Sequence, residues 1–172
     1  MSIHVCSLNL LDATVKATGA ARIVTLINVG TPVLRPQSVA EADHLFIGMN
    51  DIVELADPTH ILPAESHLDQ FLTFVRAWDR KAPLVVHCFA GVSRSTAAAY
   101  TAALALDPTR DEEELAQLLR QRSPTATPNA RIIALADQKL GRNGRMIAAI
   151  NRIGRGSDCF EGVPFALPVP ML

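Results

Sequence analysis

Cys88 and Arg94 frame a five-residue stretch whose residue types suit the chemistry of phosphate esters. An apolar run, Pro83-Leu84-Val85-Val86, precedes them, and a small-residue run, Thr96-Ala97-Ala98-Ala99, follows. This order predicts a buried strand, a tight loop and a helix N-terminus. Such a loop turns backbone N–H groups toward one point, where they bind an oxyanion. The guanidinium of Arg94 adds a planar fork that matches two phosphate oxygens. The stretch therefore predicts a thiolate nucleophile, Cys88, beneath a bound phosphate.

The residues around this pair carry a more specific pattern. A buried structural cysteine beside a solvated arginine is the simpler interpretation, but it leaves His87, the mid-loop Gly91 and the hydroxyl of Ser95 unexplained. The whole stretch resembles the signature of the cysteine-dependent protein tyrosine phosphatases, especially the compact dual-specificity type. The His-Cys pair, central glycine, arginine and following Ser/Thr of that family are matched by His87, Cys88, Gly91, Arg94 and Ser95.

The resemblance implies a role for each residue of the stretch. Cys88 attacks phosphorus and forms a thiophosphate intermediate, which divides one hard step into two. Ser95 is placed to donate to the departing thiolate, although a hydroxyl at a helix start is also common. His87 is expected to order the loop rather than to transfer protons. The phosphate oxygens would be held by Arg94 and by the backbone N–H groups of Phe89, Ala90, Gly91, Val92, Ser93 and Arg94.

A general acid must protonate the leaving oxygen, and the sequence offers two carboxylates for it. Asp51 is the first choice because Ile47-Gly48-Met49-Asn50-Asp51 resembles the strand end and acid loop of the family. Asp57 is the alternative, because the stretch before Cys88 is a few residues longer than is usual for the compact members. The run from Arg122 to Asn129 resembles the family's Arg-Pro…Pro-Asn segment. Asn129 is therefore expected near the loop, with helix capping an equally good explanation.

Hydrophobic periodicity predicts the elements that position these residues. Strands are expected over 3–6, 22–28, 44–48 and 83–87, and helices over 10–18, 65–78 and 94–106. Three further helices are expected in the second half, beginning near Asp111 and Asn129 and at Arg145. The alternation predicts an α/β fold: a short, mostly parallel central sheet flanked by helices, with a helical C-terminal half. Residues 1–172 are expected to form a single phosphatase domain in which 154–172 are an irregular tail.

Composition narrows the class of protein. The 172 residues carry a net charge of −1 without a dense basic block, which argues against nucleic acid as a partner. The three cysteines, Cys6, Cys88 and Cys159, have no zinc-binding or disulfide-framework spacing, and neither a metal nor an organic cofactor is expected. No run approaches the length of a membrane span, and no secretory signal is apparent, so a cytoplasmic location is expected.

The sequence thus predicts a phosphatase for phosphotyrosine on proteins or peptides, with phosphoserine and phosphothreonine as further candidates. A phosphoinositide or polyphosphate phosphatase is a second hypothesis, although the loop offers no lysine for a polyanion. A catalytically silent phosphate-binding module is the third. The physiological substrate, the oligomeric state and any redox role of Cys6 or Cys159 stay open.

Overall fold

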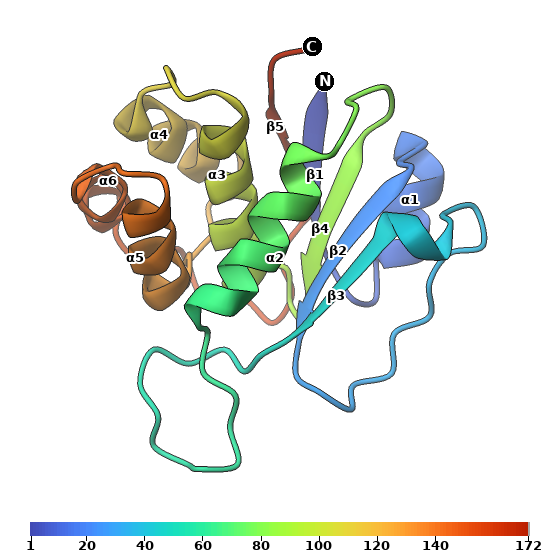
Figure 1. Cartoon of the computed structure of the whole chain (residues 1–172), viewed down its shortest axis with the longest axis horizontal. Helices are drawn as coiled ribbons and strands as arrows, with labels where there is room; N and C mark the ends of the chain where they lie inside the picture. Colours follow the sequence, from blue (N-terminus) through green and yellow to red (C-terminus); the bar gives the residue numbers. More distant parts are fainter. Residues whose placement is uncertain (172) are drawn as a thin grey trace.

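The computed structural model describes residues 1–171 as one central sheet between helices (Figure 1). The strands are β1 (Ser2–Ser7), β2 (Arg22–Ile27), β3 (His44–Gly48), β4 (Leu84–Cys88) and β5 (Phe165–Pro168). The helices are α1 (Leu11–Thr18), α2 (Glu65–Arg76), α3 (Arg94–Leu106), α4 (Glu112–Arg122), α5 (Ala130–Lys139) and α6 (Arg145–Ile153), with a 3₁₀ turn at Glu41–Asp43. The sheet order is β3-β2-β4-β1-β5, and only β5 is antiparallel to its neighbour. The predicted fold class is therefore confirmed.

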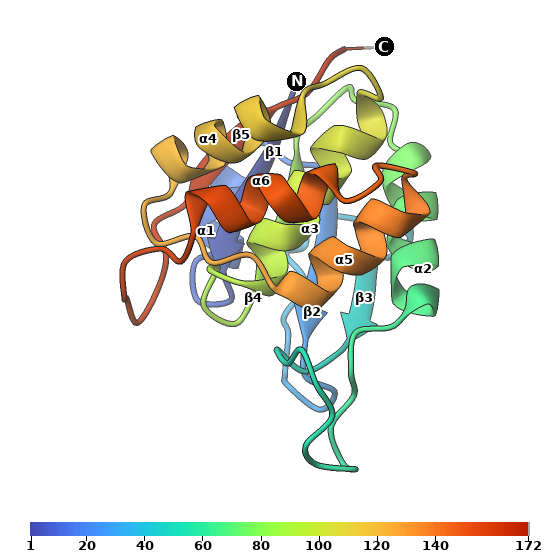
Figure 2. The same ribbon diagram turned by 90° about the vertical axis from the view of Figure 1, so that its left-hand side faces the viewer.

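Strand alternation decides which face each helix covers. Val24, Leu26 and Val86 point into the main core, which α2 to α6 complete, whereas Ile23 and Val85 pack in the smaller cluster under α1. Successive side chains of a strand point to opposite faces, so one short strand supplies both cores. Figure 2 shows α4, α5 and α6 in front of the sheet, with α1 behind it. No helix within residues 1–171 is long and apolar enough to cross a bilayer.

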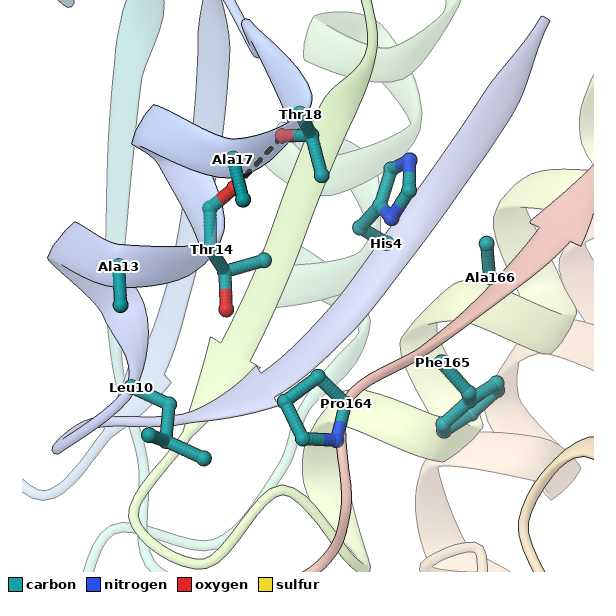
Figure 3. Close-up of a pocket in the computed structure, with 9 residues that line it drawn as sticks. All are labelled: His4, Leu10, Ala13, Thr14, Ala17, Thr18, Pro164, Phe165 and Ala166. Carbon is teal, nitrogen blue, oxygen red and sulfur yellow. Dashed lines mark hydrogen bonds between the residues drawn. The ribbon is translucent and has the colours of Figure 1, made fainter.

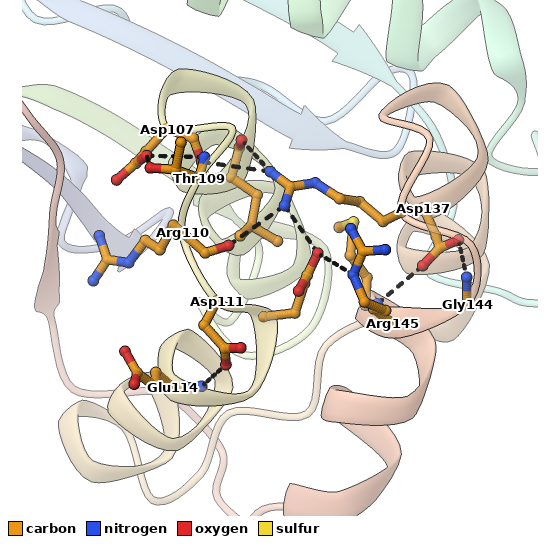
Figure 4. A network of polar contacts seen from close by, with 12 residues as sticks. Asp107, Thr109, Arg110, Asp111, Glu114, Asp137, Gly144 and Arg145 are labelled. Carbon is orange, nitrogen blue, oxygen red and sulfur yellow. Dashed lines mark hydrogen bonds and ion pairs between the residues drawn. The ribbon is translucent and has the colours of Figure 1, made fainter.

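A buried ion network joins the helices of the C-terminal half (Figure 4). Arg142 Nη1 and Arg145 Nε donate to the same oxygen, Oε1 of Glu112, over 2.9 and 3.0 Å. Arg142 Nη2 also donates to the carbonyl of Leu104 over 2.9 Å. Asp137 accepts from two backbone N–H groups at the start of α6. Several hydrogen bonds offset the cost of burying these charges, and the network fixes the helices behind α3.

The chain end departs from the predicted irregular tail. Residues 154–164 are irregular, but Phe165–Pro168 forms β5 and pairs with β1. The strand forms because Phe165 and Leu167 are buried against the core while β1 would otherwise present an unpaired edge. Pro164 directly before this short run and Pro168 at its end hide it from periodicity.

An apolar groove opens where α1 and the segment entering β5 flank β1 (Figure 3). Its volume is about 470 Å³, and Leu10, Pro164 and Phe165 lie around it together with His4. It contains none of the residues that the sequence singles out for chemistry.

Candidate active site

The predicted site residues meet at one edge of the sheet. β2, β3 and β4 are parallel, so the segments that follow them emerge side by side, where α/β proteins commonly bind ligands. These segments bring in Asn28, Asp51 and the loop from Cys88 to Arg94. A pocket of about 290 Å³ lies between them and is lined by Asp51, Cys88, Phe89, Ala90, Val92, Ser93, Arg94 and Cys159.

The loop after β4 is held by its carbonyl groups. The framework amides of Leu8, Gly162, Thr127 and Asn129 donate, in that order, to the carbonyls of Phe89, Ala90, Val92 and Ser93, over 2.8 to 3.3 Å. In a trans peptide the N–H points away from the C=O of the same plane. The N–H groups of Ala90, Gly91, Ser93 and Arg94 therefore point away from this framework. Their backbone donors are free to converge on an oxyanion.

Gly91 is required by the shape of the loop. Its φ of +74° lies in the left-handed region that glycine adopts without strain. A Cβ at this position would lie 2.8 Å from backbone atoms of Cys6 and Ser7 at the end of β1. Any other residue would push the loop away from β1.

Cys88 ends β4 beneath this loop. Only 2% of the residue is exposed, and its Sγ lies 3.1 Å from the hydroxyl oxygen of Ser95 on the first turn of α3. The short loop and the helix start bring the two side chains together. This contact is the one that the sequence pattern predicts for a departing thiolate.

Arg94 is oriented by the ends of two other strands. Its Nη1 donates to Oδ1 of Asn28 after β2 and to the carbonyl of Met49 after β3, both over 2.7 Å. Its buried Nε has no hydrogen-bond partner among residues 1–171. The guanidinium is thus fixed from behind, and its Nε edge is left for a ligand.

Asp51 is held at the rim of the same pocket. Its Oδ1 accepts from the Ser93 hydroxyl over 2.7 Å and from Asn129 Nδ2 over 2.8 Å. Its Oδ2 lies 3.9 Å from Arg94 Nε. One carboxylate oxygen is therefore occupied by two donors, and the other faces the arginine.

Asn129 has two functions in this arrangement. As the N-cap of α5, its Oδ1 accepts from the amides of Arg131 and Ile132, both over 3.1 Å. This contact fixes the side-chain orientation, because the oxygen must face the two N–H groups and the nitrogen must then face Asp51. A position near the loop and helix capping, which were alternatives from the sequence, are both present.

Asp57 lies outside the pocket. Its Oδ1 accepts from the backbone and hydroxyl of Thr59, which closes a local turn in the long loop after β3. These hydrogen bonds lower the pKa of Asp57. The structure therefore brings Asp51, and not Asp57, to Cys88 and Arg94.

His87 is buried behind the loop. Its Nε2 lies 2.6 Å from the hydroxyl of Thr25 on β2, which is also 2.7 Å from Nε2 of His44. Burial lowers the pKa of His87 to about 4. A neutral imidazole that bridges β4 to β2 agrees with the expected ordering role.

Sequence reasoning missed two residues of the site. Asn28 follows β2 in a loop of ordinary composition, and no motif marks it as the partner of Arg94. Cys159, for which the sequence left any redox role open and indicated no place in the site, is an exposed thiol at the wall of the Cys88 pocket. Its position depends on the irregular segment 154–164 passing beside the loop. Within residues 1–171, no group of three or more His, Cys, Asp or Glu side chains is arranged to hold a metal ion.

Comparisons with known proteins agree with this geometry. A family model described as "Protein-tyrosine phosphatase" matches residues 57–124, which include the Cys88 loop but not Asp51. No curated protein has significant sequence similarity to the chain.

Solved structures extend the likeness to most of the fold. Human DUSP28 is 20% identical over 82% of this chain and 92% of its own, with a TM-score of 0.61. DUSP15 is 17% identical over 88% and 89%, with a TM-score of 0.63. A mouse putative dual specificity phosphatase, complexed with zinc tungstate, is 22% identical over 83% and 84%, with a TM-score of 0.58. The chain thus has the compact dual-specificity phosphatase fold and the protein-tyrosine phosphatase pattern, which confirms the resemblance found in the sequence and supports phosphatase activity.

Proposed function

We propose that the chain hydrolyses phosphate monoesters, with phosphotyrosine in proteins or peptides as the main substrate, through a covalent phosphate on Cys88. The observation that carries the proposal is the convergence of Cys88, the Arg94 fork and the Asp51 carboxylate on one pocket. Phosphoryl transfer depends mainly on positioning and on stabilising the transferred group, and these residues supply both.

In the first step, the Cys88 thiolate attacks phosphorus in line and the bond to the ester oxygen breaks. Protonated Asp51 gives its proton to that oxygen, so the leaving alcohol departs neutral. Oδ2 is the oxygen that transfers the proton, because Oδ1 already accepts from Ser93 and Asn129. The loop amides and Arg94 stabilise the equatorial oxygens during this step.

In the second step, water attacks the thiophosphate and Asp51 accepts its proton. The phosphorus–sulfur bond breaks and inorganic phosphate is released. The Ser95 hydroxyl, 3.1 Å from Sγ, donates to the departing thiolate. This hydrogen bond stabilises the negative charge that develops on the leaving sulfur, which lowers the barrier of this step.

The pocket favours a single phosphate over a polyanion. Arg94 is the only cationic residue of its lining within the described chain, and Asp51 adds a negative charge at the rim. An inositol polyphosphate or nucleotide would bring further charges that no other cation of this lining offsets. A silent binding module is disfavoured because the nucleophile, the arginine and a positioned carboxylate are all present.

Replacement of the nucleophile tests the proposal. Cys88→Ser should abolish turnover of para-nitrophenyl phosphate and of a phosphotyrosine peptide, because a serine hydroxyl is a poor nucleophile without a base. Mass spectrometry of an acid-quenched wild-type reaction should find phosphate on the peptide that contains Cys88. Cys6→Ala removes a buried thiol that faces α1 and serves as the control, with turnover retained. Substantial activity in Cys88→Ser would refute the covalent mechanism.

A further inference from the structure

A second hollow adjoins the Cys88 pocket and is called here the side groove. Its lining comes from residues 51–54 of the loop after β3, called the acid loop, from Ser93 of the loop after β4, called the phosphate loop, and from residues 127–130 before and at the start of α5. Its volume is about 560 Å³. Asp51 and Ser93 line both hollows. The hydrogen bond between these two side chains, 2.7 Å long, is therefore the partition between them.

Hydrogen bonds to the phosphate loop hold the walls of the side groove in place without a ligand. The amides of Thr127 and Asn129 donate to the carbonyls of Val92 and Ser93, over 3.0 and 3.3 Å. On the opposite wall, Asn129 Nδ2 contacts the carbonyl of Ile52 at 3.4 Å. Both walls are thus fixed relative to Cys88, as is usual for ligand sites.

The neck of the acid loop is also closed. The Asn50 amide donates to the Ile61 carbonyl, and the Ile61 amide donates to Asn50 Oδ1, both over 2.8 Å. The intervening residues, which include Val53, therefore leave the sheet and return to it at one point. This closure holds Val53 at the groove although 49% of the residue is exposed.

The lining selects an uncharged apolar group. Ile52, Val53, Pro128 and Ala130 present hydrocarbon, and the lining contains no lysine, arginine or histidine. Its charged members are Glu54 and Asp51, both acidic, so an anionic group would be repelled. A basic side chain would have to give up water beside hydrocarbon, and Oδ1 of Asp51 is already taken by two donors.

We propose that the side groove binds an aliphatic side chain of the substrate peptide, one or two residues from the phosphorylated residue; this rests on the phosphatase function proposed above. The two hollows share a wall, so a side chain in the groove and the phosphoester beside Cys88 are close enough to belong to one peptide. An extended chain advances about 3.3–3.6 Å per residue, which limits the connection to the nearest residues. Val53 and Ala130 are then specificity-determining residues.

A peptide series measures this preference. In a phosphotyrosine peptide of otherwise small residues, each of the two positions on either side carries Leu, Ser, Lys or Asp in turn, and kcat/KM is determined for every peptide. At one position Leu should exceed Ser by about tenfold, the order expected for a buried aliphatic group. Asp should be the poorest residue there. Para-nitrophenyl phosphate, which has no neighbouring residue, provides the reference rate.

Two variants assign the preference to the side groove. Val53→Ser removes an apolar side chain, and Ala130→Glu places a carboxylate at the exposed first residue of α5, where the helix dipole tolerates it. Each should reduce the Leu-to-Ser ratio severalfold and leave the rate on para-nitrophenyl phosphate unchanged. Leu34→Ser is the matched control, since Leu34 is 89% exposed and does not line the groove.

Each outcome decides the matter. A Leu preference that falls in both variants and persists in Leu34→Ser supports the assignment. Equal rates for Leu and Ser peptides, a preference for Lys or Asp, or a Leu preference that survives both variants would overturn it while the phosphatase function stands. Absence of turnover on peptides and on para-nitrophenyl phosphate alike would contradict the phosphatase function, and the groove assignment with it.

Discussion

Replacing Asn129 with aspartate would separate the two functions that the structure gives to this side chain. Aspartate is also a good N-cap, so its carboxylate can still accept from the amides of Arg131 and Ile132. It has no N–H to donate, however, and would place a second carboxylate against Asp51, where the asparagine nitrogen now lies 2.8 Å from Oδ1. The cap should be preserved and the general acid displaced.

The size of the effect follows from the contact that is lost. A hydrogen bond to a charged group is worth about 1.5–3 kcal/mol, or roughly 10–150-fold in rate if the whole of it acts in the transition state. The loss is bounded by the worth of the acid itself, typically about 10²–10⁴-fold. We expect Asn129→Asp to lower kcat/KM by roughly 10–100-fold on an alkyl phosphate, whose leaving group needs the proton. An activated aryl phosphate should be slowed much less.

Stability and pH measurements complete the assay. Both Asn129→Asp and Asn129→Ala lose the contact with Asp51, but only alanine also removes the cap, so urea unfolding should show the further loss of about 1 kcal/mol that a cap is worth in Asn129→Ala alone. The alkaline limb of the pH–rate profile, which reports the general acid, should shift in Asn129→Asp. Ser93→Ala, which removes the other donor to Asp51 Oδ1, should shift it too while leaving the cap intact. Full activity of Asn129→Asp on the alkyl phosphate would refute the reasoning and leave Asn129 a cap only.

Three further outcomes are expected. Arg94→Lys should lose about 3 kcal/mol of transition-state stabilisation in kcat/KM, because lysine has no planar fork; a near-normal rate would mean that the loop amides suffice. Asp51→Asn should slow alkyl phosphates strongly and flatten the alkaline limb of the pH–rate profile, whereas Asp57→Asn should do neither; exchanged behaviours would assign the acid to Asp57. Because burial lowers the pKa of His87 to about 4, the unfolded chain takes up its proton first as the pH falls below 6.5. Stability from this group is therefore complete above pH 6.5 and falls by about 2 kcal/mol on going to pH 5, which urea titrations should detect in the wild type and find reduced in His87→Gln.

The fold was largely predictable because the informative patterns are local. Apolar runs and turn residues predicted the four parallel strands, and helical spacing predicted all six helices, with α3 at its observed bounds and α6 at its observed start. The fifth strand was not predictable, since a strand of four residues that follows Pro164 and itself ends in Pro168 carries too little periodicity. It exists because β1 offers an edge and the core offers room for Phe165 and Leu167.

For the site, too, the sequence predicted what is local in the chain and missed what depends on distant contacts. Cys88, Gly91, Arg94 and Ser95 lie in one stretch, and their spacing alone indicates the loop and its chemistry. The contacts that orient them join residues far apart in the chain: Asn129 reaches Asp51 across 78 positions. Such pairings depend on how helices pack on the sheet, and residue types in a single sequence do not record them.

The unpartnered Nε of Arg94 links ligand binding to the thermal stability of the whole domain. A buried N–H without an acceptor costs about 1–3 kcal/mol of folding free energy. A tetrahedral oxyanion such as phosphate or tungstate in the Cys88 pocket would accept a hydrogen bond from this N–H. The pocket exists only in the folded chain, so the oxyanion stabilises the folded state alone. At a concentration 100 times its Kd, such a ligand adds about 2.7 kcal/mol of stability. In a domain of this length, that raises Tm by roughly 5–11 °C, so a melting curve recorded with and without the oxyanion reports on the site even where turnover cannot be measured.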